Sequence, residues 1–384
     1  MKFNKWTLGL AAVGAVSLAS VVNAEEKAPT FLETAVSGTQ ISGYVNTSAH
    51  WNFNKYTGTG SAVSSSGYDS GKKDGFNLDA VVVTISKSLD ETEWASGYKV
   101  EIAYGQDAAS VGMNDASEDN NSIKQAYVTL RTPLGNGIDW KVGVWDTILG
   151  YEVFDAGNNP NYTRSYGYMM EPTTYAGVLA SYKFCDVVSA SAGVANVSNG
   201  GGAVNPVNRS SIDSRKTYVG SVALTAPESW GFLAGSTAYG AVAYGAGAGN
   251  NRNNINWYAG LVANTGVKGL KVGAAYDYAG NDAKTGPGAT QADWNNAAAI
   301  YASFQATEKL SVHGRAEYAW SDNNVSGLSS KSVYAFTGTV QYDLWKNVLS
   351  RAEIRWDRAN GGDFGPSNSS KDAVLLAANI IYKF

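Results

Sequence analysis

Cysteine and histidine are nearly absent from this chain of 384 residues, which contains one Cys and two His. Cys185 has no second cysteine with which to form a disulfide within the chain. So few Cys and His residues, scattered along the sequence, also exclude the ligand spacing of a zinc site. We therefore expect no metal and no cofactor.

Charged residues are also scarce, at 16% of the chain against ~25% in a typical soluble domain. The formal net charge is −4, and no basic patch or run stands out, so we expect no nucleic-acid partner. Aromatic residues and glycine are plentiful instead, with 23 Tyr, 11 Trp and 43 Gly, which argues against disorder. Beyond the N-terminus, no stretch approaches the ~18 apolar residues of a membrane-spanning helix.

The N-terminus has the pattern of a secretory signal peptide. Lys2 and Lys5 begin it, residues 8–22 are almost all small or apolar, and Val22-Asn23-Ala24 suits a cleavage site. We predict a signal peptide over residues 1–24, because the apolar stretch is short for the alternative, a transmembrane anchor. Residues 25–38 then form a short periplasmic segment, too short for a plug domain.

Alternation of apolar and polar residues runs from about residue 40 to the end. In ISGYVNTSAHWNF, Val45, Ala49 and Trp51 share one face, while Asn46 and His50 share the other. A strand of this length with two unlike faces fits one that crosses a bilayer at a tilt. We predict roughly sixteen strands, near residues 41–53, 76–88, 97–105, 122–132, 138–146, 173–184, 187–196, 217–226, 232–245, 255–264, 269–279, 294–306, 309–320, 331–344, 348–358 and 371–384.

Connections between these segments alternate in length. Every second one is short, such as TPLGNG, CD and LWKN, and the others are long and rich in Gly, Asn and Ser. Tight turns at one end and long loops at the other are the plan of an outer-membrane barrel. A soluble β-sandwich is the alternative, but it would not sort its loops by length in succession. We therefore predict an all-β fold over residues 39–384, a transmembrane antiparallel β-barrel with long external loops and short periplasmic turns.

The polar face of several strands carries charges. Apolar residues must face lipid, where a charge costs ~2–4 kcal/mol at the midplane, so the charged face lines a water-filled interior. The predicted inward residues are Lys141, Arg315, Glu317, Arg351, Glu353, Arg355 and Asp357.

Aromatic residues cluster at the ends of the predicted strands. Such residues form two girdles at the membrane interfaces of outer-membrane barrels. Here the long-loop ends carry Trp51, Trp257, Trp320 and Trp356, and the short-turn ends carry Trp140 and Tyr382. With an even number of strands the chain returns to the periplasmic rim, where Phe384 would pair with the first strand and close the barrel. This final aromatic resembles the C-terminal signature that the barrel assembly machinery recognises.

The third long connection, WDTILGYEVFDAGNNPNYTRSYGYMMEPTTYAG, is rich in aromatic residues. A solvated loop does not need them, so we predict that residues 147–172 fold into the lumen. Its charged residues Glu152, Asp155, Arg164 and Glu171 would then lie at a constriction opposite the inward arginines, where charges of both signs bias which ions pass. An external aromatic cap and a subunit contact remain open as alternatives.

Three blocks carry a family resemblance. ISGYVNTSAHWNFN, FNLDAVVVTISKSLDETEWASGYKVEIAYG and GYEVFDAGNNPNYTRSY resemble the OmpL-like β-barrel porin family of Gram-negative outer membranes. The similarity covers essentially the mature chain, and the third block is the most distinctive. It implies a pore-forming barrel in the bacterial outer membrane, and it assigns no catalytic residues. The inward folding of the third loop also occurs in general porins.

We therefore predict a porin, not an enzyme, that admits small hydrophilic solutes and ions passively. A channel selective for a sugar or an anion is the first alternative. A barrel enzyme and a structural barrel with a blocked lumen are the others, since a triad is assembled in space rather than in sequence. We expect contact with outer-membrane lipid and lipopolysaccharide. Monomer and homotrimer both remain open, and the small lipid-facing residues that suggest a subunit contact are Ala298, Ala302, Gly314 and Ala316.

Overall fold

The computed structural model describes residues 38–53, 72, 74–110, 121–197, 215–247, 252–282, 293–322, 330–361 and 370–384. The predicted signal peptide and nearly all of the segment 25–38 lie outside the described residues, as do large parts of the long loops.

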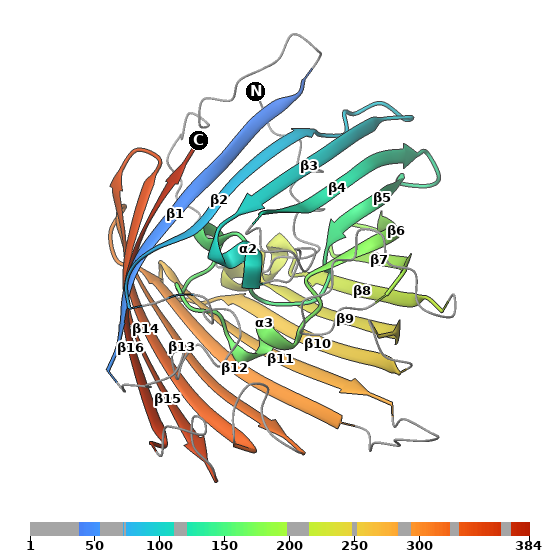
Figure 1. Cartoon of the computed structure of the whole chain (residues 1–384). Helices are drawn as coiled ribbons and strands as arrows, with labels where there is room; N and C mark the ends of the chain where they lie inside the picture. Colours follow the sequence, from blue (N-terminus) through green and yellow to red (C-terminus); the bar gives the residue numbers. More distant parts are fainter. Residues whose placement is uncertain are drawn as a thin grey trace.

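The described residues form sixteen antiparallel strands that close into one barrel (Figure 1). Each strand pairs with its neighbours in the sequence, and β1 pairs with β16. The strands are β1 Gln40–Asn52, β2 Gly75–Lys87, β3 Ser96–Tyr104, β4 Asn121–Thr132, β5 Ile138–Asp146, β6 Thr174–Lys183, β7 Val188–Ala195, β8 Thr217–Thr225, β9 Thr237–Ala246, β10 Asn253–Asn264, β11 Leu270–Asn281, β12 Asp293–Gln305, β13 Leu310–Ser321, β14 Ser332–Trp345, β15 Val348–Asn360 and β16 Asp372–Lys383. The predicted fold and strand number are confirmed.

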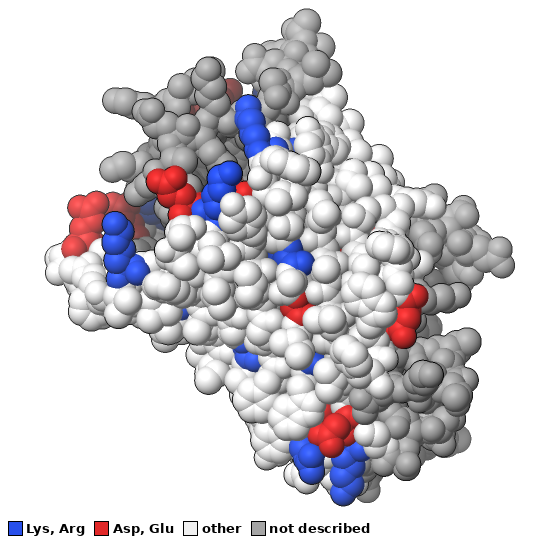
Figure 2. Space-filling view, turned by 90° about the vertical axis from the view of Figure 1, so that its left-hand side faces the viewer, with Lys and Arg blue, Asp and Glu red and all other residues white. Residues whose placement is uncertain are grey.

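Successive residues of each strand lie on opposite sides of the barrel wall, so the alternation of apolar and polar residues in the sequence separates an outer face from an inner face. On β12, Ile300 is 64% exposed on the outside, whereas its neighbour Tyr301 is 4% exposed on the inside. On β15, Ile354 faces out between the buried, inward Glu353 and Arg355. Figure 2 shows the result on one side, a broad area of uncharged side chains with most charged ones toward the two ends. This is the surface that a lipid bilayer requires.

The last strand closes the barrel against the first, as predicted. Phe384 donates its amide to the Gly43 carbonyl at 3.0 Å, and Gly43 donates to the Phe384 carbonyl at 2.9 Å. A β-carbon on Gly43 would lie 2.1 Å from the carbonyl oxygen of Val82 and 2.7 Å from the Phe384 ring. Glycine is therefore required for this close approach.

Short helices interrupt the barrel at a few points. They are α2 Gln106–Ser110, η2 Ala156–Asn158, α3 Tyr166–Met170 and η3 Glu228–Leu233. The strand expected to begin near residue 232 begins at Thr237 instead, because Pro227 opens the 3₁₀ turn η3 and Gly231 bends the backbone at φ 60°. Among the described residues, no helix is long and apolar enough to cross a membrane.

Candidate functional site

Residues 147–172 leave the wall after β5 and return to it at β6. The neck of this loop is closed by a hydrogen bond from the Thr147 amide to the Thr173 carbonyl at 2.9 Å. The loop carries η2 and α3, and the Ser165 hydroxyl caps α3 by accepting the Tyr168 amide at 3.1 Å. Figure 1 shows α3 inside the ring of strands. The loop meets inward side chains from both halves of the wall.

Two charged side chains of β15 bind the main chain of the loop. Arg351 donates to the carbonyl oxygens of Ala156 at 2.9 Å and Asn159 at 2.6 Å. Glu353 accepts the amide of Tyr162 at 2.5 Å. Both side chains are buried. Hydrogen bonds with an ionised partner are stronger than neutral ones, so this strand holds the loop firmly by its backbone.

Arg315 of β13 joins the wall to two carboxylates and to the loop. Its guanidinium lies 2.8 Å from Glu152 of the loop and 2.6 Å from Glu317 of its own strand. It also donates to the Thr163 carbonyl at 2.7 Å. Glu317 in turn accepts the amide of Tyr166 at 2.7 Å. Arg315 is 2% exposed, and these partners, together with the hydroxyls of Thr163 and Thr337, offset the burial of its charge.

Arg355 of β15 completes this polar side of the wall. It pairs with Asp357 at 2.8 Å and donates to the Arg164 carbonyl at 2.7 Å. The hydroxyl of Tyr166 donates to Asp357 at 2.8 Å, and the Arg355 guanidinium lies 5.1 Å from the centre of the Tyr166 ring. Helix α3 is therefore anchored through both its backbone and its first side chain.

The four charged loop residues singled out from the sequence have different surroundings. Glu152 meets an inward arginine, as described. The side chain of Arg164 turns back to its own loop and donates to the Phe154 carbonyl at 2.8 Å. Asp155 is half-buried, and burial raises the pKa of its carboxyl above the usual range.

The predicted inward residue Lys141 belongs to the wall, on β5. Its Nζ atom lies 5.0 Å from the ring centre of Tyr127.

Glu171, the fourth of these residues, faces a carboxylate rather than an arginine. Its carboxyl is in hydrogen-bonding contact with that of Asp277 on β11. Burial, and then the charge of Asp277, hold the pKa of Glu171 well above its ordinary value. Sequence reasoning missed Asp277. The available signal was its position as the single acid on the inward face of LKVGAAYDYAGN, among Gly and Ala residues.

A second buried polar cluster, also missed, joins the loop to β1 and β2. Lys72 pairs with Asp79 at 3.2 Å. The Tyr162 hydroxyl donates to Ser48 at 2.9 Å, and Ser48 donates to Asp79 at 2.8 Å. Within the described ranges, no group of three or more His, Cys, Asp or Glu side chains is arranged to hold a metal ion.

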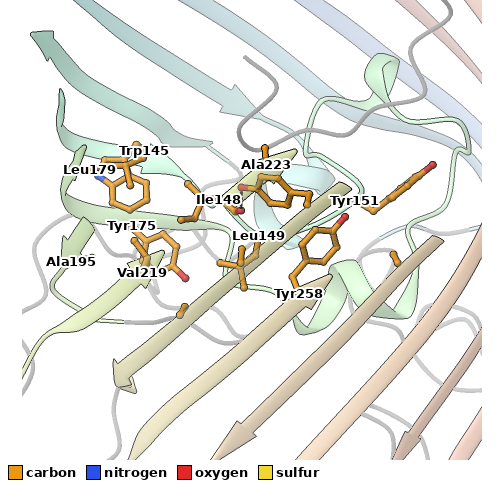
Figure 3. Close-up of a cluster of buried hydrophobic side chains, with 14 of the residues drawn as sticks. Trp145, Ile148, Leu149, Tyr151, Tyr175, Leu179, Ala195, Val219, Ala223 and Tyr258 are labelled. Carbon is orange, nitrogen blue, oxygen red and sulfur yellow. Dashed lines mark hydrogen bonds between the residues drawn. The ribbon is translucent and has the colours of Figure 1, made fainter. Parts of the chain in front are cut away.

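The opposite side of the wall holds the loop by apolar contacts (Figure 3). The buried cluster there consists of Trp145, Ile148, Leu149, Tyr151, Tyr175, Leu179, Ala195, Val219, Ala223, Tyr239, Ala241, Ala243, Tyr258, Ala275, Ala299 and Tyr301. Tyr151 stacks on Tyr301 with ring centres 3.9 Å apart. A β-carbon on Gly273 would lie 2.0 Å from the Tyr151 hydroxyl oxygen, so glycine makes room for this ring. Tyr239 adds one polar contact, a donation to the Ile148 carbonyl at 2.5 Å.

The aromatic residues expected at the membrane interfaces lie toward the strand ends. Trp51, Trp257 and Tyr382 are exposed, whereas Trp140, Trp320, Trp356 and Phe384 are half-buried. Sequence reasoning missed further exposed aromatic side chains at or next to short turns, among them Trp94, Phe184, Trp230, Phe232 and Trp345. The role of all these rings at a lipid interface stays a prediction.

A family model described as "Putative beta-barrel porin-2, OmpL-like" matches residues 38–384. No curated protein matches this chain.

Solved porin structures resemble the barrel. The anion-selective porin from Comamonas acidovorans has a TM-score of 0.61 at 13% identity, covering 90% of this chain and 99% of that one. OmpF of Salmonella typhi, solved with daunomycin, has a TM-score of 0.60 at 12% identity, covering 92% of this chain and 100% of that one. The trimer form of OmpT of Vibrio cholerae has a TM-score of 0.59 at 13% identity, covering 90% of this chain and 99% of that one. At such identities the likeness concerns the fold.

Proposed function

We propose that this chain, which belongs to the OmpL-like β-barrel porin family and is an outer-membrane porin, lets small hydrophilic solutes and ions diffuse passively, with the loop 147–172 as the element that narrows their passage. The observation that carries the proposal is the closed barrel, apolar outside and charged inside. Such a wall separates hydrocarbon from a polar interior. Passage then depends on width and on the charges along it.

Conductance of the purified protein in a planar bilayer tests the proposal. We expect stepwise current increases, and liposomes that contain the protein should swell in neutral sugars up to a limiting size. Protein that is folded and inserted but gives neither current nor swelling would favour the structural barrel with a blocked lumen.

The charged residues at the loop are proposed to set the field along the passage. Glu152 with Arg315 and Glu317 forms a group of both signs where the loop meets β13. Contact between the Arg351 and Arg355 side chains and the loop backbone supports the idea that these residues define the position of the narrowing.

A preference for anions is the second candidate. Lys141 and Lys271 point inward from β5 and β11, and in the described part of the chain neither forms an ion pair with a carboxylate. Both side chains are partly exposed, so no buried carboxylate neutralises their positive charge. The similar porin from Comamonas acidovorans is described as anion-selective.

Replacing both lysines tests this preference. With Lys141→Gln and Lys271→Gln together, we expect the ratio of anion to cation permeability to fall severalfold, because two inward positive charges are removed. Reversal potentials in a salt gradient measure the ratio. Lys268→Gln, in an exposed turn beside Lys271, is the control and should leave it unchanged. An unchanged ratio in the double variant would contradict the assignment.

We further propose that the protein is not an enzyme and that it assembles as a homotrimer. An apolar groove of about 740 Å³ runs over the outer wall from β11 to β15, with Gly314, Phe336 and Gly338 among its lining residues. A β-carbon on Gly314 would meet nothing within 4 Å, so packing inside this chain does not require glycine there. Cross-linking in mild detergent tests the trimer, and lipase and protease assays on refolded protein should be negative. Recognition of the C-terminal strand by the barrel assembly machinery and contact with lipopolysaccharide stay proposals.

A further inference from the structure

The two ends of the loop touch each other next to β11. Gly150 has φ +110°, and a β-carbon on it would lie 2.0 Å from Oε2 of Glu171. One residue before Glu171, the carbonyl of Met170 accepts a hydrogen bond from Asn256 of β10 at 3.0 Å. The neck of the loop, which runs from the Thr147–Thr173 hydrogen bond to Gly150 and Glu171, is therefore packed tightly and is held to β10 by the hydrogen bond of Asn256.

Glu171 and Asp277 meet at this neck, and no Lys or Arg in the described part of the chain forms an ion pair with either carboxyl. Oε2 of Glu171 and Oδ1 of Asp277 are buried and accept no hydrogen bond within the described residues. The titratable and charged groups that face the pair are Glu152 of the loop, Tyr168 of α3, Tyr239 of β9, Tyr258 of β10 and Glu317 of β13. Arg315 is already bound to Glu152 and Glu317. Two buried carboxyls in contact are stable when they share a proton and repel when both are ionised.

The interior beside Glu171 is lined by buried side chains and holds a small cavity. Each of the sixteen strands contributes at least one inward side chain that is buried. A cavity of about 30 Å³ borders Glu152 and Glu171 inside the loop. It is large enough for one water molecule, with which the carboxyl of Glu171 can exchange a proton.

We propose that Glu171 and Asp277 form a proton-controlled latch on the loop, which a shared proton holds closed and which loss of that proton to water releases. This inference rests on the proposed function as a channel. In the closed form the neck lies against β11 and the passage is narrow. When the proton leaves, two negative charges remain in contact in a buried place, and their repulsion drives the neck from β11 and widens the passage.

The direction of the pH effect follows from Glu171. Because burial and Asp277 raise the pKa of Glu171 in the folded protein, the fold binds a proton that the unfolded chain releases. The stabilising contribution is fully present below the unfolded pKa and is lost as pH rises through the folded value. Alkaline conditions therefore release the latch, and acid conditions hold it.

Single-channel recording at a series of pH values tests the latch. We expect the ratio of open to closed time to rise with pH, by up to about tenfold per pH unit for release of one proton. Glu171→Gln should remove this rise and keep the narrow form at every pH, because an amide carries no charge. Asp277→Asn should do the same from the wall side. Glu228→Gln, in the exposed turn η3, is the matched control and should keep the wild-type profile.

The outcomes separate the latch from the channel itself. If wild type and every variant insert with normal β-sheet content and none conducts at any pH, the proposed function fails. If wild type conducts without pH dependence, or Glu171→Gln and Asp277→Asn keep the wild-type profile, the latch is wrong. A response to calcium at constant pH, in place of the response to pH, would also overturn it, since the pair would then bind a cation.

Discussion

The two sides of the inner wall hold the same loop by different physical means. The polar wall consists of Arg315, Glu317, Arg351, Glu353, Arg355 and Asp357 on β13 and β15. The apolar wall is the buried cluster around Leu149 and Tyr151. Charged hydrogen bonds have a required direction, and apolar packing does not. The polar wall therefore specifies where the loop lies, and the apolar wall supplies adhesion.

Much of the polar wall binds loop backbone rather than loop side chains. Arg351, Arg355 and Arg315 all donate to carbonyl oxygens of the loop. Carbonyl groups are present whatever the side chain. The position of the loop is thus less sensitive to its own sequence than to the charges of the wall.

Breaking the polar wall should have the largest effect. Arg315→Ala leaves the carboxylates of Glu152 and Glu317 buried without their guanidinium, which should lower the free energy of unfolding by about 3–5 kcal/mol. Urea unfolding of the protein in lipid vesicles measures it. Arg358→Ala breaks an exposed pair with Asp372 of 3.0 Å and serves as control, with an expected loss below about 1 kcal/mol. Equal losses in the two variants would mean that the buried pairs do not stabilise the loop.

Breaking the apolar wall should have a smaller effect. Leu149→Ala creates a cavity in the buried cluster, and we expect a loss of about 2–3 kcal/mol that does not depend on salt. The same urea experiment at two salt concentrations checks both points. Leu134→Ala, at an exposed turn, should change stability little. A marked salt dependence in Leu149→Ala would mean that the two walls are not independent.

The smallest effect should come from a polar contact inside the apolar wall, the hydrogen bond of Tyr239. Tyr239→Phe removes the donation to the Ile148 carbonyl and should cost about 0.5–1.5 kcal/mol. Tyr218→Phe, on the outer face of β8, is the matched control and should be neutral. If Tyr239→Phe lowers the free energy of unfolding as much as Leu149→Ala does, then a directional hydrogen bond also helps to position the loop at the apolar wall.

The barrel could be predicted from the sequence because its signal is local. Alternation along each strand and alternation of turn length need no knowledge of distant residues, and they gave sixteen strands that the structure confirms. The aromatic composition of residues 147–172 likewise distinguished this connection from a solvated loop in the sequence.

The partners inside the barrel could not be predicted, because they depend on strand tilt and register. Nothing local indicates that Arg351 binds the backbone of Ala156, nor that Glu171 meets Asp277, which is more than a hundred residues later in the chain. Arg164, which was expected opposite the inward arginines, contributes its carbonyl to Arg355 while its charge stays within the loop. The constriction and the aromatic girdles stay predictions.

The loop also spans the junction between the first and last strands. Tyr162 bonds Ser48 on β1, while the Gly157 carbonyl accepts a hydrogen bond from Lys383 of β16 at 3.4 Å. These two strands are the farthest apart in the sequence, and bringing them together is the contact of highest order in the fold. The loop therefore connects the first and last strands from inside the barrel, and its hydrogen bonds add to the strand pairing that closes the sheet.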